Sequence, residues 1–376
     1  MMLRFVLLLT CLCHSAKASF TPPTMIFGSG KDAIDKGFNI LETASKFVPQ
    51  GRVVQTAKET WKFAWRRMMT ELAPQDKTGA YSRPKYSFTN KIGENYNFPD
   101  EPGRFHLYVG NPCPWCHRAH LALSLRSITP DEIGMTVLID DPVKASRGGW
   151  IFGAESGTRD PLGSRDLREL YEKLSPNFKG RCTAPLLVDL EQKKIVSNES
   201  SDIVRMLNDL SFGNNNKERL DLYPENLKSQ IDESNQWVYE LLNNGVYRCG
   251  FSTQQAAYDS ASADVRRGLE RCQDILTKQP FLCGSTFTES DLRLLPTILR
   301  FDGAYGPLFH AGGAHLRIRD YPAILAWLQR CWDLPLGVSD TIDIQDATSS
   351  YYRQLFPLNA GGLIPTPISE KDIGLN

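Results

Sequence analysis

The motif Cys113-Pro-Trp-Cys116 follows directly on the apolar run 105–109. The run predicts a buried strand and the residues after it predict a helix, so Cys113 would stand at a helix N-terminus. Unpaired N–H groups and the positive end of the helix dipole stabilise a thiolate at that place. Pro114 suits the first helical position, because its fixed φ matches a helix and its missing N–H would have had no partner. The order strand–CxxC–helix therefore predicts a thioredoxin-like redox or thiol-transfer site.

Three other interpretations use the same residues. The string from Cys113 to His117 matches the C-x-x-C-H pattern of c-type haem attachment. Cys113, Cys116, His117 and His120 could supply four zinc ligands, although ligands on one helix turn cannot easily surround a tetrahedral ion without a second pair elsewhere. The two cysteines could also be small apolar residues of a core. The strand–helix context favours redox chemistry over all three.

Length and charge set the broad class. The chain has 376 residues and a formal net charge of zero. The length predicts two domains plus extensions, and without a long basic tract we expect no nucleic-acid partner. Cys249, Cys272, Cys283 and Cys331 are scattered through sequence with helical periodicity, so they are predicted to be reduced core residues and not a disulfide framework.

The N-terminus has the pattern of a targeting leader. Residues 1–18 combine Arg4, the apolar run 5–13 and the cleavage pattern Ala16-Lys-Ala18 of a signal peptide. The run is too short for a stable transmembrane anchor, so we expect no stable membrane insertion. The Ala-Ser-Phe junction resembles the bipartite presequences of algae with secondary plastids. Residues 19–86 are therefore expected to be a transit segment and N-terminal extension, partly helical, and the protein is expected in a plastid. Secretion is the competing interpretation.

Residues 87–212 predict an α/β domain with the element order of thioredoxin. The glycine-, serine- and aspartate-rich stretch 141–180 is too long for an ordinary connection and is predicted to be a functional insert. Pro185 precedes a strand at the place where thioredoxin-like folds have a cis-proline facing the cysteine, although proline is also tolerated as an ordinary first strand residue. The expected strands are 104–110, 135–139, 184–190 and 194–197, and the expected helices are 114–125 and 202–210.

Residues 213–345 predict an all-helical domain. Thr288-Glu-Ser-Asp291 has the pattern of a helix-capping box. A thioredoxin-like α/β domain followed by an all-α domain is the glutathione transferase architecture, and residues 346–376 would form a C-terminal extension. The expected helices are 227–243, 258–276, 292–301 and 322–332.

From about residue 87 to the C-terminus, the chain resembles the glutathionyl-hydroquinone reductases, also called xi-class glutathione transferases. The resemblance implies that Cys113 attacks the glutathione sulfur of a glutathionyl-hydroquinone and that a second glutathione resolves the mixed disulfide. It also implies a homodimer, with glutathione as co-substrate and no permanently bound cofactor. The matching segments are Gly103-Arg-Phe-His-Leu-Tyr-Val109, Cys113-Pro-Trp-Cys-His-Arg118, Gly149-Trp-Ile-Phe152, Ile195-Val-Ser-Asn-Glu-Ser-Ser201, Asn243-Asn-Gly-Val-Tyr247, Ile298-Leu-Arg-Phe-Asp302 and Ile364-Pro365.

The resemblance also implies which residues bind glutathione. Glu199 would take the γ-glutamyl ammonium and Ser200 the carboxylate, a plain helix N-cap being the alternative. Ala184, beside Pro185, would offer its backbone to the cysteinyl unit, although the family usually has valine there. Trp150 matches a tryptophan that lines the glutathione site, and an ordinary surface-loop anchor is its alternative.

Two tyrosines of the helical domain match residues that face the quinol in the family. Tyr247 and Tyr305 would hydrogen-bond a quinol oxygen and assist proton transfer, with core packing as the alternative for each. His117 and Arg118 follow the family string and are interpreted as helix-surface or packing residues. Cys116 stands where many members have alanine, so it is expected to be dispensable, and a Cys113–Cys116 disulfide is the alternative route.

Asn198-Glu-Ser200 is an N-glycosylation sequon on the proposed glutathione site, and we interpret it as coincidental. Two rival functions remain open at this point. One is an omega-type glutathione transferase acting as a dehydroascorbate or thiol reductase. The other is a non-catalytic thioredoxin-fold binding module. The segment with Trp150 and the string ending at Tyr247 favour the quinol-specific interpretation.

Overall fold

The computed structural model describes residues 46–93, 96–145, 149–212, 219–335 and 337–375. The expected signal peptide 1–18 and the first part of the expected transit segment lie outside the described residues. The chain divides into two compact units, Met1–Phe63 and Ala64–Asn376. All the predicted site residues belong to the second unit.

A five-stranded sheet carries the α/β half of this unit, in the order β3-β2-β1-β4-β5. Strand β1 pairs in parallel with β2 and antiparallel with β4, and β4 pairs antiparallel with β5. This is the predicted thioredoxin order, with the short β3 added antiparallel at the edge beside β2. The strands are β1 (Phe105–Gly110), β2 (Ile133–Asp140), β3 (Trp150–Ile151), β4 (Leu186–Asp189) and β5 (Lys194–Ser197).

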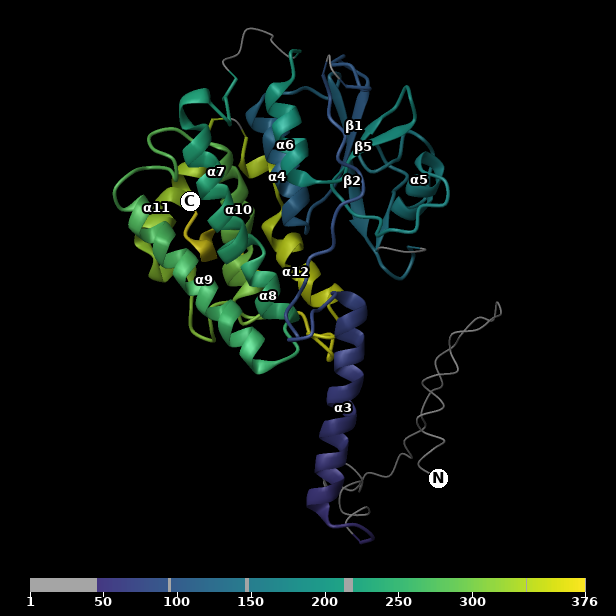
Figure 1. Ribbon diagram of the computed structural model, residues 1–376, viewed down its shortest axis with the longest axis vertical. Coiled ribbons are helices and arrows are strands. Elements are labelled where there is room, and N and C mark those ends of the chain that lie inside the picture. The colour runs from purple at the N-terminus through teal and green to yellow at the C-terminus, as the bar shows by residue number, and fades with distance from the viewer. Residues whose placement is uncertain (1–45, 94–95, 146–148, 213–218, 336, 376) are drawn as a thin grey trace. The chain divides into compact units, whose positions relative to one another are not determined.

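Helices cover both faces of the sheet. Along β1, Leu107 and Val109 pack into the main core, while Tyr108 packs into a second cluster, as the two-residue period of a strand requires. Helices α4 (Pro114–Leu125) and α6 (Ser200–Asp209) lie between the sheet and the helical half, and α5 (Leu167–Leu174) lies on the far side (Figure 1). The N-terminus of α4, which carries the CxxC motif, is thereby placed at the boundary of the two halves.

Helix α5 lies inside the stretch 141–180 that the sequence predicted as an insert. Asp166 caps it by accepting a hydrogen bond from the Glu169 N–H, and the buried Leu167, Leu170 and Tyr171 form one face. This stretch therefore holds both the edge strand β3 and the helix that covers the outer sheet face. Its glycine- and serine-rich composition concealed a helix of only eight residues.

The helical half contains π-helical as well as α-helical segments. The predicted capping box is present, since Thr288 and Asp291 exchange their side-chain-to-backbone bonds at the start of α10. Helix α12 lies almost wholly in the predicted C-terminal extension 346–376, yet Ile344, Ala347 and Tyr351 are buried in the main core. The elements are α7 (Lys228–Trp237), the π-helix η3 (Val238–Asn243), α8 (Gly245–Phe251), α9 (Gln255–Leu276), α10 (Glu289–Arg300), the π-helix η4 (Phe301–Tyr305), α11 (Pro322–Trp332) and α12 (Ile344–Gln354).

Residues 64–86, expected as part of the N-terminal extension, pack within the second unit. They begin in helix α3 (Gln50–Leu72), where Met69 is fully buried in the main core together with Ala73. The indole N–H of Trp65 donates to the carbonyl of Pro357 at 2.9 Å. The end of this extension is therefore an integral part of the fold.

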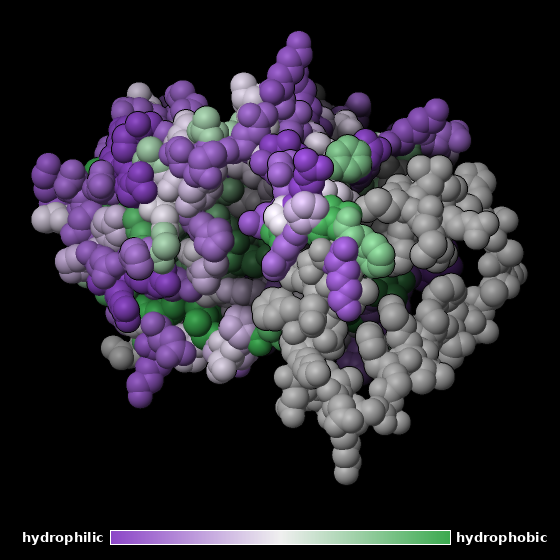
Figure 2. All heavy atoms as spheres, turned by 90° about the horizontal axis from the view of Figure 1, so that it is seen from below, coloured by the Kyte–Doolittle hydropathy of each residue, from purple (hydrophilic) through white to green (hydrophobic). Residues whose placement is uncertain are grey.

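Charged and polar residues cover most of the described surface on the face shown in Figure 2, and apolar residues appear there in separate areas. Within the described ranges, no helix combines the length and the apolar character needed to cross a membrane.

Candidate active site

Cys113 is both the predicted nucleophile and the N-cap of α4. Its Sγ atom accepts a hydrogen bond from the backbone N–H of Cys116 at 3.3 Å, and Pro114 occupies the first turn. A side-chain acceptor at the N-cap satisfies one of the N–H groups that a helix start leaves unpaired. The side chain is only partly buried. The predicted placement of Cys113 at a helix N-terminus is therefore confirmed.

The surroundings of Cys113 favour its thiolate. Burial by itself raises the pKa of this thiol, but hydrogen bonds from the Cys116 thiol and from the N–H groups of Cys116 and Trp115 outweigh it, together with the charge of Arg300. The resulting pKa is lowered to about 7. Cys116 is buried, and its pKa is raised well above the usual value by burial and by Cys113. The pair thus divides into a thiol that ionises readily and a neutral donor.

The predicted proline turn faces Cys113. The peptide bond between Ala184 and Pro185 is cis, and the Ala184 carbonyl lies 3.7 Å from the Cys113 Sγ atom. Asn198, the residue after β5, supports this turn, because its side-chain N–H groups donate to the Tyr171 hydroxyl and to Thr183 Oγ1, at 3.1 and 3.2 Å.

The same contacts bear on the glycosylation sequon. The Asn198 side chain is 3% exposed and its amide nitrogen is occupied by these two bonds. A glycan attached to that nitrogen cannot be accommodated in this fold, in agreement with the interpretation of the sequon as coincidental.

A cavity of about 370 Å³ brings residues of both halves together beside the motif. Its lining includes Trp115 from α4, Ala184 from the proline turn, and Tyr247 and Phe251 from α8. An aromatic wall next to the nucleophile suits a flat apolar ring. Two of the predicted residues, Ala184 and Tyr247, therefore share one cavity.

A second cavity of about 400 Å³ contains Glu199 and several arginines, among them Arg118 and Arg293. Glu199 caps α6 by accepting the Ser201 N–H at 3.0 Å, so the N-cap alternative describes part of its geometry, yet it also lines the cavity. Ser201 lines it as well, whereas the side chain of Ser200, which was predicted to take the carboxylate, is 1% exposed and does not line the cavity, so that role stays a prediction. A carboxylate among arginines can bind the charged groups of an amino-acid-like ligand.

Trp115 lines both cavities and was noticed in the sequence only as part of the motif. The guanidinium carbon of Arg83 lies 3.6 Å from its ring centroid, and that of Arg118 lies 4.4 Å away. These are cation–π contacts, one from within α4 and one from a segment outside the helices and strands. Arg83 comes from the N-terminal extension, where no motif indicated a role in the site.

Arg118 and His117 are not helix-surface residues. Arg118 is 2% exposed and donates to Asn243 Oδ1, and burial together with the charge of Arg293 lowers its pKa to about 9. It therefore carries its charge at neutral pH. His117 is 3% exposed and lies between Thr341 and Arg300. The packing interpretation holds for both residues, and the surface interpretation was wrong, because α4 is covered by the helical half on this side.

The two predicted tyrosines belong to a set of three. The hydroxyl of Tyr351, on α12, lies 3.0 Å from that of Tyr247 and 2.8 Å from that of Tyr305, and the last two hydroxyls are 3.4 Å apart. Burial raises the pKa of each phenol, so all three stay protonated at neutral pH. Tyr305 ends the π-helix η4, and the π-helix η3 precedes Tyr247, which fits the frequent use of π-helical turns at functional sites. Sequence reasoning missed Tyr351 because it predicted no helix there.

Trp150 lies apart from the lining of both cavities. Its ring packs on Gly110 so closely that a Cβ atom at that position would lie 2.4 Å from it. Trp150 therefore supports the end of β1, just before the turn that leads into Cys113. A direct contact of Trp150 with glutathione stays a prediction.

No group of three or more histidine, cysteine or acidic side chains in the described residues could hold a metal ion. The described cysteines are all unbridged, and Cys249, Cys272, Cys283 and Cys331 are buried as the sequence predicted.

A thioredoxin-like domain with a thiolate at a helix N-terminus, joined to an all-α domain, defines the class of protein. Residues 112–210 match the glutathione S-transferase N-terminal domain, and residues 255–330 match the glutathione S-transferase C-terminal domain. The chain belongs to the glutathione transferase superfamily, within the family of xi-class transferases and glutathionyl-hydroquinone reductases.

Individual relatives span most of the chain. Glutathione S-transferase omega-like 2 of Schizosaccharomyces pombe is 36% identical over 77% of this chain and 93% of the relative. Glutathionyl-hydroquinone reductase YqjG of Escherichia coli is 36% identical over 71% of this chain and 80% of its own length. The crystal structure of glutathione-S-transferase Xi from Phanerochaete chrysosporium matches with a TM-score of 0.74 and 35% identity, covering 80% of this chain and 97% of that one. Glutathione is the substrate that the family shares, and a structure of the E. coli protein contains it.

Proposed function

We propose that this glutathione-dependent oxidoreductase reduces glutathionyl-hydroquinones to hydroquinones. In the first step the Cys113 thiolate attacks the glutathionyl sulfur. A sulfur–sulfur bond forms, the carbon–sulfur bond breaks, and the ring carbon keeps the bonding electrons and takes a proton. The ring is thereby reduced and the two sulfurs are oxidised to a mixed disulfide.

In the second step the thiolate of another glutathione attacks the glutathione sulfur of that disulfide. Glutathione disulfide leaves and the Cys113 thiolate is restored. One observation carries the proposal: the Cys113 Sγ atom caps α4 with a pKa lowered to about 7, beside a cavity walled by Trp115 and Tyr247. A low pKa serves both steps, since it provides the attacking thiolate and makes Cys113 a good leaving group.

The two cavities divide the substrate between them. Glu199 takes the γ-glutamyl ammonium, and the neighbouring arginines take its carboxylate. Ala184 binds the cysteinyl unit through its backbone. The quinol ring lies in the aromatic cavity, where Tyr247, supported by Tyr305, donates a hydrogen bond to a ring oxygen.

Turnover of glutathionyl-benzohydroquinone with excess glutathione tests the proposal in wild type, Cys113→Ser and Cys116→Ser. We expect Cys113→Ser to lose activity and Cys116→Ser to keep most of it, because free glutathione resolves the disulfide. Equal loss in both variants would indicate a dithiol route. If the wild type reduces dehydroascorbate but not the quinol conjugate, the omega-type function replaces this one. If it turns over neither substrate, the result favours the non-catalytic binding module.

We further propose that the protein is a homodimer and that its leader directs it to a plastid. The family resemblance supports the first and the leader pattern of residues 1–20 supports the second. Light scattering at micromolar concentration should give twice the mass of one chain. A fluorescent protein fused behind residues 1–63 should enter the plastid of a cell with secondary plastids, and its appearance in the medium would instead favour secretion.

A further inference from the structure

Arg300, the last residue of α10, reaches from the helical half to the turn that leads into Cys113. It is fully buried, and its guanidinium makes four hydrogen bonds. Two of them go to the carbonyls that precede the nucleophile, with Nη2 donating to Asn111 at 2.7 Å and Nε to Pro112 at 3.1 Å. The other two go to Pro296 within its own helix and to His117 Nδ1, both at 3.1 Å.

The positive charge of Arg300 has no carboxylate partner. Among the described residues, none with an acidic side chain lies within ion-pair distance of it, and all four acceptors are formally neutral. Burying an arginine without a counter-charge is costly even when its N–H groups are satisfied. Cys113 follows the bonded carbonyl of Pro112, and among the groups on which the charge of Arg300 acts it is the one whose pKa is lowered to about 7.

His117 cannot share or replace this charge. The Thr341 hydroxyl donates its proton to the Val338 carbonyl, so it accepts from His117 Nε2, and Nδ1 is left to accept from Arg300. This pattern requires the neutral ring. Burial and the charge of Arg300 also lower the pKa of His117 well below its usual value.

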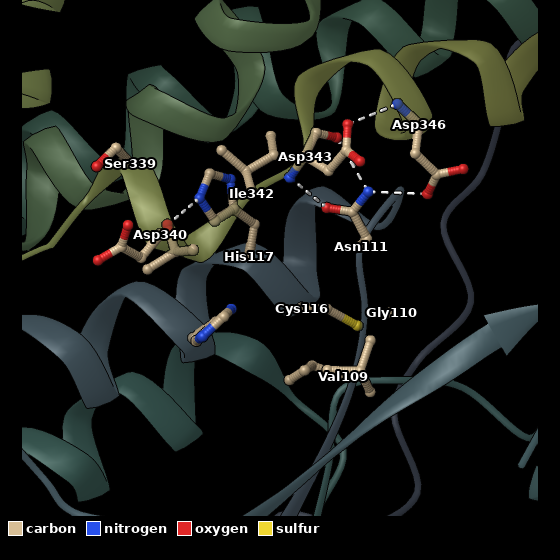
Figure 3. Close-up of a pocket in the computed structure, with 13 residues that line it drawn as sticks. Val109, Gly110, Asn111, Cys116, His117, Ser339, Asp340, Ile342, Asp343 and Asp346 are labelled. Atoms are coloured by element: carbon tan, nitrogen blue, oxygen red, sulfur yellow. Dashed lines mark hydrogen bonds between the residues drawn. The ribbon is translucent and has the colours of Figure 1, made fainter. Parts of the chain in front are cut away.

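The same turn is held from its other side. The Asn111 side chain accepts the Asp343 N–H at 3.0 Å and donates to the Asp343 carbonyl and to Asp346 Oδ2, at the start of α12 (Figure 3). Arg300 binds the backbone of Asn111 and these bonds bind its side chain. A displaced turn would move the Sγ atom away from the helix N–H groups.

We propose that Arg300 is a positioning residue of the Cys113 reaction, because its buried guanidinium holds the Asn111–Pro112 turn and provides the counter-charge for the Cys113 thiolate. The inference rests on the proposed role of Cys113 as nucleophile. Besides Arg300, the ionisable groups acting on Cys113 are the Cys116 thiol on α4 and the Tyr305 phenol on η4, which both stay protonated at neutral pH.

The rate of alkylation of Cys113 by iodoacetamide between pH 5 and 9 tests this, followed by mass spectrometry of the Cys113 peptide. In wild type the rate should rise with a midpoint at about pH 7. In Arg300→Met the midpoint should move to higher pH. At a pH below both midpoints, the rate in the variant should then be about tenfold lower than in wild type for each pH unit of that shift. Arg300→Lys, which keeps the charge but loses the forked geometry, should lie between the two. In the reductase assay, Arg300→Met should lower kcat far more than it raises the KM for glutathione.

Arg126→Met is the matched control. Arg126 is another buried arginine, caps the other end of the same helix and donates to a backbone carbonyl, that of Leu220. It should leave the midpoint unchanged. An unchanged midpoint in a natively folded Arg300→Met protein would overturn the proposal.

If Arg300→Met does not fold, Arg300→Lys and Arg300→Gln are compared instead. A lower alkylation midpoint in the lysine variant than in the glutamine variant supports the role of Arg300 as counter-charge, and equal midpoints refute it. Alkylation involves no quinol, so a failed reductase assay with an Arg300-dependent midpoint would reject the proposed substrate alone.

Discussion

The Sγ atom of Cys113 lies 3.3 Å from the backbone N–H of Cys116 and caps the helix that carries both cysteines. The bond is strongest when the sulfur is anionic, because charge-assisted hydrogen bonds are stronger than neutral ones. In the proposed cycle, formation of the mixed disulfide removes that charge and weakens the cap, and release of glutathione disulfide restores it. The helix start therefore favours the free thiolate at the end of each cycle.

Activity should follow the ionisation of Cys113. Below about pH 7, kcat/KM for the quinol conjugate should fall tenfold per pH unit, since it reports the free enzyme, and above that value it should level off. Cys116→Ala removes a donor and should move the midpoint upward, whereas Cys116→Ser retains a hydroxyl donor and should move it less. A profile that is flat from pH 5.5 to 7 would contradict the assignment of Cys113.

Tyr351→Phe should lower kcat for the quinol conjugate by about tenfold, a typical loss when a polar contact near the reacting group is removed. Without this hydroxyl, the hydroxyls of Tyr247 and Tyr305 keep only the hydrogen bond to each other, at 3.4 Å. Tyr258→Phe is the control, because its hydroxyl binds the His310 carbonyl elsewhere in the helical half. The idea fails if the two variants are indistinguishable in steady-state kinetics.

Asn198→Ala should lower the free energy of unfolding by about 1–3 kcal/mol, because its hydrogen bonds to the Tyr171 hydroxyl, to Thr183 Oγ1 and from the Phe88 N–H are lost. It should also weaken glutathione binding, since Thr183 leads into the Ala184–Pro185 turn. Asn90→Ala, at an exposed position, should cost less than about 0.5 kcal/mol. Urea denaturation and calorimetric titration with glutathione measure the two effects, and equal stability of both variants would refute the first.

The protein should lose stability in mild acid through His106. Burial lowers the pKa of His106 to about 4, while the unfolded chain has an ordinary histidine near 6.5. Below pH 6.5 the unfolded state binds the extra proton, so the stability is complete above that pH and is lost as pH falls towards 4. The loss is up to about 1.4 kcal/mol per pH unit.

Urea unfolding at pH 7.5, 6.5 and 5.5 should show a shallower pH dependence in His106→Gln than in wild type. The amide of glutamine can still bond Thr136, which His106 Nε2 contacts at 2.8 Å. Identical pH dependences in the two proteins would show that His106 is not responsible.

Elements with a clear local pattern were predictable. The helix 114–125 and the strand 194–197 were predicted with the bounds that the structure shows, since a proline at the helix start and a short apolar run define them. Helix α5 was not, because its apolar face is confined to a few positions in polar, glycine-rich sequence. The order of strands and helices in the α/β half could therefore be predicted, but the helix and the edge strand within residues 141–180 could not.

The site itself was predictable only where a motif carried it. Cys113, Glu199 and Tyr247 stand in recognisable strings. Arg300 acts on Asn111 across 189 positions of sequence, and Tyr351 meets Tyr247 across 104, so no local pattern pairs them. Such contacts depend on how α10 and α12 pack against the α/β half.

The buried Met69 and the position of Arg83 over Trp115 set a limit on how the chain can mature. A processing peptidase that removed everything up to residue 86 would take away a core side chain and one of the two cations at the indole. Cleavage of the proposed leader must therefore fall upstream of Trp65, whose indole N–H binds the Pro357 carbonyl, and a mature protein sequenced from its first residue should still contain the Trp65–Tyr86 stretch.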